Sequence, residues 1–309
     1  MRERGRLGAM AAGAIAIFVA VALSSCAQDV KITAPRYALV YGIATYLYDP
    51  LQYTVNDARS MVSALQAGGM NPTINERENA QVTKSQIQSD ILSLANVSSD
   101  STIVFYFSGH GVSNADIISF GLTPTDPGPY IVPYDAVAEY SGITSTTVAN
   151  LVTPAELESW LAQAGTKNVI VVLDCCYSGA FVPSGSAIDA SPQSYSMQSF
   201  SAFSTAISNF GGLLSANASA SGSKTPIVLS AAGSEELSYD GTAAMQHGVF
   251  TYYLLQAAVN AGSDGVVTTT QAYAYTSAAI KSQWDAAYSY DSFLPHLSGG
   301  VRDLVLFAN

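Results

Sequence analysis

The sequence is poor in charged side chains, and above all in basic ones. Only 11% of its 309 residues are charged, and 12 Lys and Arg stand against 23 Asp and Glu, which gives a formal net charge of −11 at pH 7. Such a chain lacks the attraction to phosphates that dominates nucleic-acid binding, so we expect no nucleic-acid partner. The acidic balance is compatible with basic peptides as ligands, although a plain solubilising surface explains it as well.

Cysteine and histidine are scarce too, with three of each. Cys175 and Cys176 are adjacent, and neighbouring residues rarely bridge because disulfide geometry requires a larger separation of the Cα atoms. No disulfide framework is therefore expected. Of the histidines, His247 precedes a predicted helix, where we expect it to cap or pack, and His296 lies in a predicted Pro-His-Leu turn. We expect no metal site from these histidines.

The first 26 residues have the pattern of a targeting segment. Residues 1–6 are basic, residues 7–23 are uncharged and rich in Ala, Ile and Val, and Ser-Ser-Cys follows. This order is typical of a signal peptide, and its Leu-Ser-Ser-Cys ending resembles a bacterial lipobox, in which Cys26 is lipidated. An uncleaved membrane anchor is the alternative. Residues 27–35 then form a tether, and the remainder lies outside the cytoplasm at a membrane, the outer one if the host has such a membrane.

Two β-rich segments each break into a motif that carries chemistry. Residues 169–173 predict a strand buried on both faces, and Asp-Cys-Cys-Tyr-Ser-Gly follows at 174–179. Residues 102–107 predict a second strand, which breaks into Ser-Gly-His-Gly at 108–111. In open α/β sheets, function gathers at such carboxyl ends. If the two strands are neighbours, His110 and Cys176 come within reach, as a cysteine nucleophile and its base require.

The other segments alternate between strands and helices. Strands are expected at 36–43, 72–74, 226–232 and 303–307, and helices near 56–67, 83–94, 154–164, 248–258 and 270–284. This alternation is typical of a parallel sheet covered by helices. We therefore expect one α/β domain over 36–309, with about six mostly parallel strands, helices on both faces and a Ser-, Ala- and Gly-rich insert or linker at about 182–224.

Four separated motifs resemble those of caspase-like peptidases of the metacaspase and bacterial orthocaspase group. They are Arg-Tyr-Ala-Leu-Val-Tyr-Gly-Ile at 36–43 with Asn-Asp-Ala at 56–58, Tyr-Phe-Ser-Gly-His-Gly at 106–111, Asp-Cys-Cys-Tyr-Ser-Gly at 174–179, and Gly-Val-Phe-Thr-Tyr-Tyr-Leu-Leu at 248–255. They follow the family's order over roughly residues 36–307. The resemblance implies a caspase-like three-layer sandwich and a cysteine endopeptidase that requires no cofactor for its chemistry.

The family's pattern also implies roles for residues of the two strand-end motifs. Cys176 matches the nucleophile and His110 its base, and the backbone N–H groups of Gly111 and Cys176 match the oxyanion hole. A histidine held by ordinary loop contacts is the alternative for His110. Cys175 stands at a variable position, where a buried packing thiol is the plain alternative. Tyr177 stands where the family often has His.

Substrate preference follows from acids at matching positions. In metacaspase-like enzymes the pocket for the residue before the cut (P1) is acidic, and here Asp57, Asp174 and Ser108 match that pocket. The resemblance therefore implies cleavage of protein or peptide substrates after Arg or Lys. A helix N-cap is the alternative for Asp57. Because residues 177–223 contain no Lys or Arg, we expect an active single chain, or one cut only near Lys224.

Two alternatives stay open. Some relatives need calcium, and the acidic candidates to bind it are Asp116, Asp126, Asp135 and Asp264, none of which has EF-hand spacing. Asp135 is equally suited to ordering its loop. The alternative function is a lipoprotein whose caspase-like domain binds peptides or proteins without cutting them, which the intact dyad disfavours.

Overall fold

The structure is a computed structural model that describes residues 33–47, 50–67, 72–112, 117–118, 123, 130–136, 148–177, 226–231, 239–262, 265–289, 295–298 and 303–308. At positions 176 and 177 it describes the backbone alone. The predicted signal peptide, most of the tether and the predicted insert lie outside these residues. In the described part of the chain, no helix is both long enough and apolar enough to span a membrane.

A mostly parallel sheet forms the centre of the fold, with strand order β2-β1-β3-β5-β6-β8 and with β4 beside the end of β3. Its strands are β1 (Arg36–Gly42), β2 (Thr73–Glu78), β3 (Thr102–Val112), β4 (Tyr130–Ile131), β5 (Asn168–Tyr177), β6 (Ile227–Ser230) and β8 (His296–Ser298). The β1–β2, β1–β3, β3–β5 and β5–β6 pairs are parallel, whereas β4 and β8 are antiparallel to their neighbours. A small separate sheet pairs β7 (Val266–Thr268) with β9 (Val305–Ala308).

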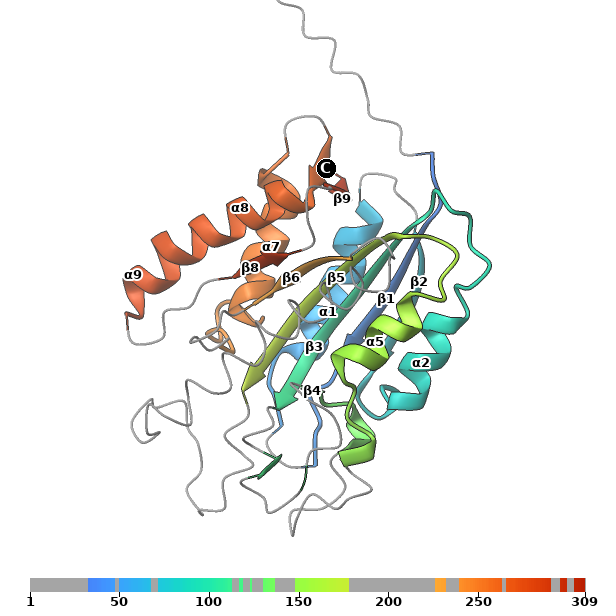
Figure 1. Ribbon diagram of the computed structural model, residues 1–309. Helices are drawn as coiled ribbons and strands as arrows, with labels where there is room; N and C mark the ends of the chain where they lie inside the picture. The colour runs from blue at the N-terminus through green and yellow to red at the C-terminus, as the bar shows by residue number, and fades with distance from the viewer. Residues whose placement is uncertain are drawn as a thin grey trace, which may run out of the picture.

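Helices cover both faces of the sheet, which gives the expected three-layer α/β sandwich (Figure 1). One face packs against α2 (Lys84–Leu92) and α5 (Pro154–Leu161), and the other against α1 (Thr54–Gln66), α7 (Val249–Asn260) and α8 (Thr269–Ala279). A π-helical turn (Ile280–Trp284) and α9 (Asp285–Ala287) follow α8, and 3-10 turns lie at Asn79–Gln81 and Tyr134–Ala136.

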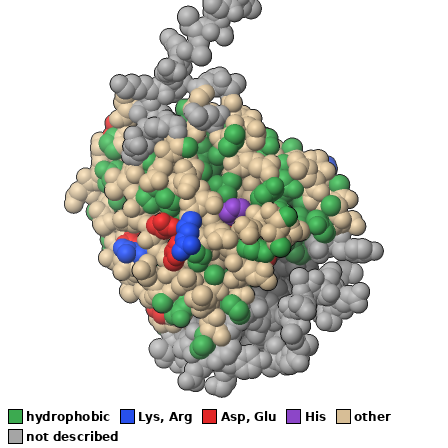
Figure 2. Space-filling model, turned by 180° about the vertical axis from the view of Figure 1, so that it is seen from behind, with side chains coloured by type: hydrophobic (Ala, Val, Ile, Leu, Met, Phe, Trp, Pro, Cys, Tyr) green, Lys and Arg blue, Asp and Glu red, His purple; other side chains and the backbone are tan. Residues whose placement is uncertain are grey.

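The central strands are apolar along their length because both of their faces are buried. In β3, Phe105 and Phe107 point into the core under α2 and α5, while Val104 and Tyr106 point into the core under α1 and α7. This alternation is the two-residue repeat of a strand. The chain carries few charged residues, and Figure 2 shows a small group of acidic and basic side chains on the back face.

One expectation about the outer strands is wrong. The final apolar run is a strand, as expected, and it pairs with β7 in the small sheet. The main sheet ends in β8, within the segment predicted to be a turn around His296. A three-residue strand carries too little alternation to be detected, and its pairing with β6 joins segments far apart in the chain.

The motif strands also continue beyond their apolar runs. β3 extends to Val112 and β5 to Tyr177, so all of the first motif and residues 174–177 of the second lie inside strands. The polar ends of β3 and β5 pair with each other. Their paired segment begins with Ser108 opposite Asp174 and ends with Gly111 opposite Tyr177. The β3–β5 ladder therefore pairs part of their backbone groups, while the backbone N–H of His110 donates to the Tyr46 hydroxyl.

Candidate active site

The two motif strands are neighbours, which is the arrangement that brings positions 110 and 176 within reach. In the parallel β3–β5 pair, Ser108 is in register with Asp174, and His110 is in register with Cys176. Adjacent strands lie about 4.8 Å apart, so the backbones of positions 110 and 176 are side by side. The fold thus brings a residue with an imidazole next to a residue with a thiol, although the two are distant in sequence.

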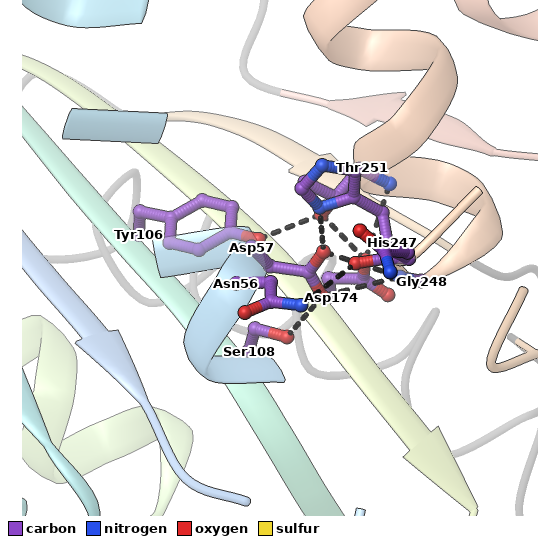
Figure 3. Close-up of polar contacts among 9 residues, drawn as sticks. Asn56, Asp57, Tyr106, Ser108, Asp174, His247, Gly248 and Thr251 are labelled. Carbon is purple, nitrogen blue, oxygen red and sulfur yellow. Dashed lines mark hydrogen bonds and ion pairs between the residues drawn. The ribbon is translucent and has the colours of Figure 1, made fainter. Parts of the chain in front are cut away.

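Asp57 reaches the same edge of the sheet from the first turn of α1. Its carboxylate accepts hydrogen bonds from the Ser108 hydroxyl at 3.0 Å and from the Gly248 N–H at 3.1 Å, and it lies 2.9 Å from Nδ1 of His247 (Figure 3). When Asp57 is ionised its oxygens can only accept, so Nδ1 of His247 then donates to it. Asp57 is 1% exposed, which makes these contacts its main source of stabilisation.

Asp174 comes from β5 and meets the same helix start. Its Oδ2 accepts the backbone N–H of Thr251 at 3.2 Å and the Thr251 hydroxyl at 2.6 Å. Since that hydroxyl donates to Asp174, it accepts from the hydroxyl of Tyr106, 2.6 Å away. Gly248 is the N-cap of α7 and Thr251 its third residue. The two carboxylates therefore lie where free backbone N–H groups and the helix dipole favour negative charge.

These six residues are called the acid cluster below: Asp57, Ser108, Asp174, His247, Gly248 and Thr251. Burial raises the pKa of Asp57 above its ordinary value, and the contacts with His247, Ser108 and Gly248 partly offset this effect. Burial and the charges of both carboxylates raise the pKa of Tyr106 well above its ordinary value. A cationic group entering here would favour the ionised carboxylates.

Gly248 is required for space. A Cβ atom at this position would lie 2.8 Å from Oδ2 of Asp174 and 3.2 Å from Oδ2 of Asp57. Its φ of −57° is accessible to any residue, so the constraint is the close approach of the helix start to both acids.

His110 belongs to a second group of residues, called the histidine cluster below: Tyr46, His110 and Val132. The rings of His110 and Tyr46 have centroids 4.4 Å apart, and the backbone N–H of His110 donates to the Tyr46 hydroxyl at 3.0 Å. That hydroxyl donates in turn to the carbonyl of Val132 at 2.8 Å. His110 is 1% exposed and Tyr46 is 4% exposed.

Cys175, which precedes Cys176 in β5, is a core residue. It is 1% exposed in the core under α2 and α5. Burial and the charge of Asp174 raise the pKa of its thiol well above the ordinary value, so it stays protonated. This is the packing thiol expected as the plain alternative at that position. The side chain of Cys176 lies outside the described part of the structure.

Two expectations about acids are settled by their contacts. Asp57 does not cap its own helix, because the N-cap of α1 is Tyr53; its carboxylate instead accepts the N–H of the N-cap of α7. Asp135 orders its loop, with its carboxylate accepting the N–H of Lys84 at 3.1 Å.

The other candidate residues give little further evidence. Gly111 lies within β3, in register with Tyr177 and with Ile131 of β4. Cys26, Asp116, Asp126, Lys224 and Asp264 lie outside the described residues. Among the residues that are described, no three His, Cys, Asp or Glu side chains gather as metal ligands would.

Sequence reasoning missed three contributors to the site. Tyr46 follows the first strand in a segment without a recognisable pattern. Thr251 lies inside the Gly-Val-Phe-Thr motif, and the resemblance of that motif to the family's is the available signal. His247 directly precedes that motif and was expected only to cap or pack.

Comparison with known proteins agrees with this architecture. No curated protein matches the chain. The crystal structure of a structural genomics target from Geobacter sulfurreducens aligns with 87% of this chain and 95% of its own, at 18% identity and a TM-score of 0.50, which is a similarity of fold. The model of the caspase domain family matches residues 35–288, well over half of the sequence. The chain therefore belongs to the caspase domain family.

Proposed function

We propose that this protein is a membrane-anchored cysteine endopeptidase in which His110 and Cys176 form the catalytic dyad. The observation that carries the proposal is the register of β3 and β5, which pairs position 110 with position 176. Membership of the caspase domain family supports cysteine peptidase-like chemistry on protein substrates. Caspase-like cysteine peptidases need no cofactor for catalysis, so the chain's own residues supply each step.

In the proposed reaction, His110 takes the thiol proton of Cys176, and the thiolate attacks the carbonyl carbon of the scissile peptide bond. The N–H groups of Gly111 and Cys176 stabilise the oxyanion that forms. The imidazolium then protonates the leaving amine, which departs and leaves a thioester. His110 next takes a proton from water, and the resulting attack releases the acid product and the free thiol.

The proposed specificity is for Arg or Lys before the cut, as in the metacaspase and orthocaspase group. Asp57 and Asp174 supply two carboxylates, and Ser108 donates to Asp57 and is in register with Asp174. Burial makes the ionised form of Asp57 costly, so a substrate cation that neutralises it would be favoured. His247 already contacts this carboxylate, so a P1 side chain has to share Asp57 with it.

The proposed location is extracytoplasmic, with lipidated Cys26 holding the domain at a membrane, the outer one if the host has such a membrane. The basic, apolar and Ser-Ser-Cys segments of residues 1–26 support this part of the proposal. Metabolic labelling with a clickable fatty acid tests it: label is expected in the wild type and not in Cys26→Ala.

The activity is tested with fluorogenic peptides that end in Arg, Lys or Asp. They are offered to the detergent-solubilised full-length protein under reducing conditions, with and without calcium, beside Cys176→Ala. We expect turnover of the Arg or Lys peptides that vanishes in the variant. Turnover of the Asp peptide would overturn the specificity and leave the dyad standing. No turnover of any peptide would favour the binding lipoprotein instead.

A further inference from the structure

The short strand β4 contacts β3 at the residue proposed as the base. In this antiparallel pair, Gly111 is in register with Ile131 and Val112 with Tyr130. The next pair in the same register is His110 with Val132. A hydrogen-bonded pair of this kind exchanges two bonds, one in each direction.

At this pair, one bond is direct and the other is relayed. The Val132 N–H donates to the His110 carbonyl at 3.0 Å. In the opposite direction, the backbone N–H of His110 donates to the Tyr46 hydroxyl at 3.0 Å, and that hydroxyl donates to the Val132 carbonyl at 2.8 Å. The hydroxyl of Tyr46 is thus inserted into the β3–β4 ladder at His110, while its ring packs against the imidazole.

Neighbouring residues hold Tyr46 in this position and leave space for its hydroxyl. The backbone N–H groups of Ala44 and Thr45 both donate to Oδ1 of Asn79 at 2.9 Å, which fixes the segment leading to Tyr46. Gly109 leaves room for the hydroxyl, because a Cβ atom there would lie 2.7 Å from Oη of Tyr46.

The relay requires a neutral phenol, because a phenolate accepts but cannot donate. Burial raises the pKa of Tyr46 well above its ordinary value, so the phenol keeps its proton. The thiol of Cys175 on β5 also acts electrostatically on Tyr46. Among the described residues, the titratable ones beside His110 are Tyr46, from the segment after β1, and Cys175 and Cys176, from the neighbouring strand β5.

We infer that Tyr46 is a positioning residue for His110: its hydroxyl completes the ladder at the base, and its ring holds the plane of the imidazole. This inference rests on the proposed function for the identity of the base. Its consequence is that the hydroxyl affects the rate of the chemical step and not the binding of substrate, because it touches His110 and β4 and not the acid cluster.

The test compares Tyr46→Phe with Tyr41→Phe. The first variant keeps the ring and loses the relay, whereas the control loses another buried hydroxyl, which contacts Asp90 at 3.3 Å. Two quantities are measured on the full-length protein: kcat and KM on a cleaved peptide, and the pH profile of Cys176 alkylation by iodoacetamide, resolved from Cys175 by peptide mass spectrometry. Alkylation follows the thiolate fraction and so reports the dyad without substrate.

We expect Tyr46→Phe to lower kcat by about 10- to 100-fold, the scale of a misplaced catalytic group, with KM unchanged and the alkylation profile moved to higher pH. Tyr41→Phe should leave both the rate and the profile at wild-type values. Gly109→Ala, whose Cβ would press on the same hydroxyl and on the Phe107 ring, should move the alkylation profile in the same direction and replaces Tyr46→Phe if that variant fails to fold.

An alkylation profile identical to wild type would overturn the inference even if kcat fell, because a merely structural role lowers activity without moving the dyad's titration. If the wild type cleaves no peptide, the proposed function fails. The alkylation profiles of wild type, Tyr46→Phe and Tyr41→Phe then still decide whether Tyr46 positions His110.

Discussion

The carboxyl end of the sheet carries two clusters that are stabilised in different ways. In the acid cluster, buried carboxylates from α1 and β5 accept hydrogen bonds from the start of α7, a helix that follows in the last third of the chain. In the histidine cluster, a neutral phenol joins β3 to β4 through two hydrogen bonds and a ring contact. The stability of the acid cluster therefore depends on charge, whereas that of the histidine cluster depends on ring packing and neutral hydrogen-bond donors.

This difference separates two kinds of mutational effect. The acid cluster links α1, β5 and α7, so changes there affect stability and the binding of a cationic side chain together. The histidine cluster lies against the proposed base, so changes there affect the chemical step. The predictions below follow this division from the largest effect to the smallest.

Removal of the base should have the largest effect. General acid–base catalysis contributes about 10²- to 10⁴-fold to rate, so His110→Ala should lower kcat by that factor. KM for an Arg peptide should stay unchanged, because the acid cluster keeps its contacts. Steady-state kinetics test this, with His296→Ala on β8 as the matched control. A rise in KM with kcat preserved would contradict the division.

Gly248→Ala should break the acid cluster by overpacking. The added Cβ atom would lie 2.8 Å from Oδ2 of Asp174, and overpacking of this kind costs about 1–3 kcal/mol. Urea denaturation should show a free energy of unfolding lowered by this amount, together with a raised KM for Arg peptides. Wild-type stability and wild-type KM in this variant would show that the helix start does not press against the acids.

His247→Leu should sharpen the comparison through pH. Burial raises the pKa of Asp57, and His247 is among the groups that counteract this rise. Its loss should raise that pKa further, so Asp57 takes up its proton at a higher pH as the solution is acidified. Because a protonated acid attracts no cation, KM for an Arg peptide should begin to rise at a higher pH than in the wild type.

The control for this prediction is His296→Leu, which should keep the wild-type pH dependence of KM. The alkylation profile of Cys176 should also stay in place in His247→Leu, since His247 belongs to the acid cluster, where it contacts Asp57. A pH dependence of KM that is identical in His247→Leu and the wild type would remove His247 from the proposed pocket.

Cys175→Ala should have the smallest effect. The thiol is buried in the core and protonated, so its loss should lower the free energy of unfolding by about 1 kcal/mol, the ordinary scale of a single substitution. Peptide hydrolysis should continue at the wild-type rate per folded molecule. Loss of hydrolysis in Cys175→Ala would mean that the nucleophile has been assigned to the wrong cysteine.

Much of the fold follows from local pattern. The continuous apolar runs of β1, β3 and β5 predict a parallel sheet with two buried faces, and adjacency of β3 and β5 places His110 beside Cys176. Thr153 and Glu156 have the sequence spacing of a capping box, and the structure has that capping box at the start of α5. The apolar runs and the capping box are local signals, whereas the adjacency of β3 and β5 is a long-range contact that they do not encode.

The rest depends on contacts that no local pattern encodes. Asp57 meets Gly248 across 191 positions, and Tyr46 meets Val132 across 86. The role of Tyr46 also needs the two-residue strand β4, which is too short to show alternation. The carboxylates at 57 and 174 were found by resemblance, whereas their attachment to the start of α7 emerges only in three dimensions.

Covalent labelling tests the central claim most directly. The full-length protein is treated with a peptidyl-arginine chloromethyl ketone, in which a thiolate displaces chloride to form a thioether, and the modified residue is located by peptide mass spectrometry. We predict one adduct on Cys176 in the wild type and in Cys175→Ala, none in Cys176→Ala, and no adduct from the matched aspartate reagent. An adduct on Cys175, or equal labelling by both reagents, would contradict the account.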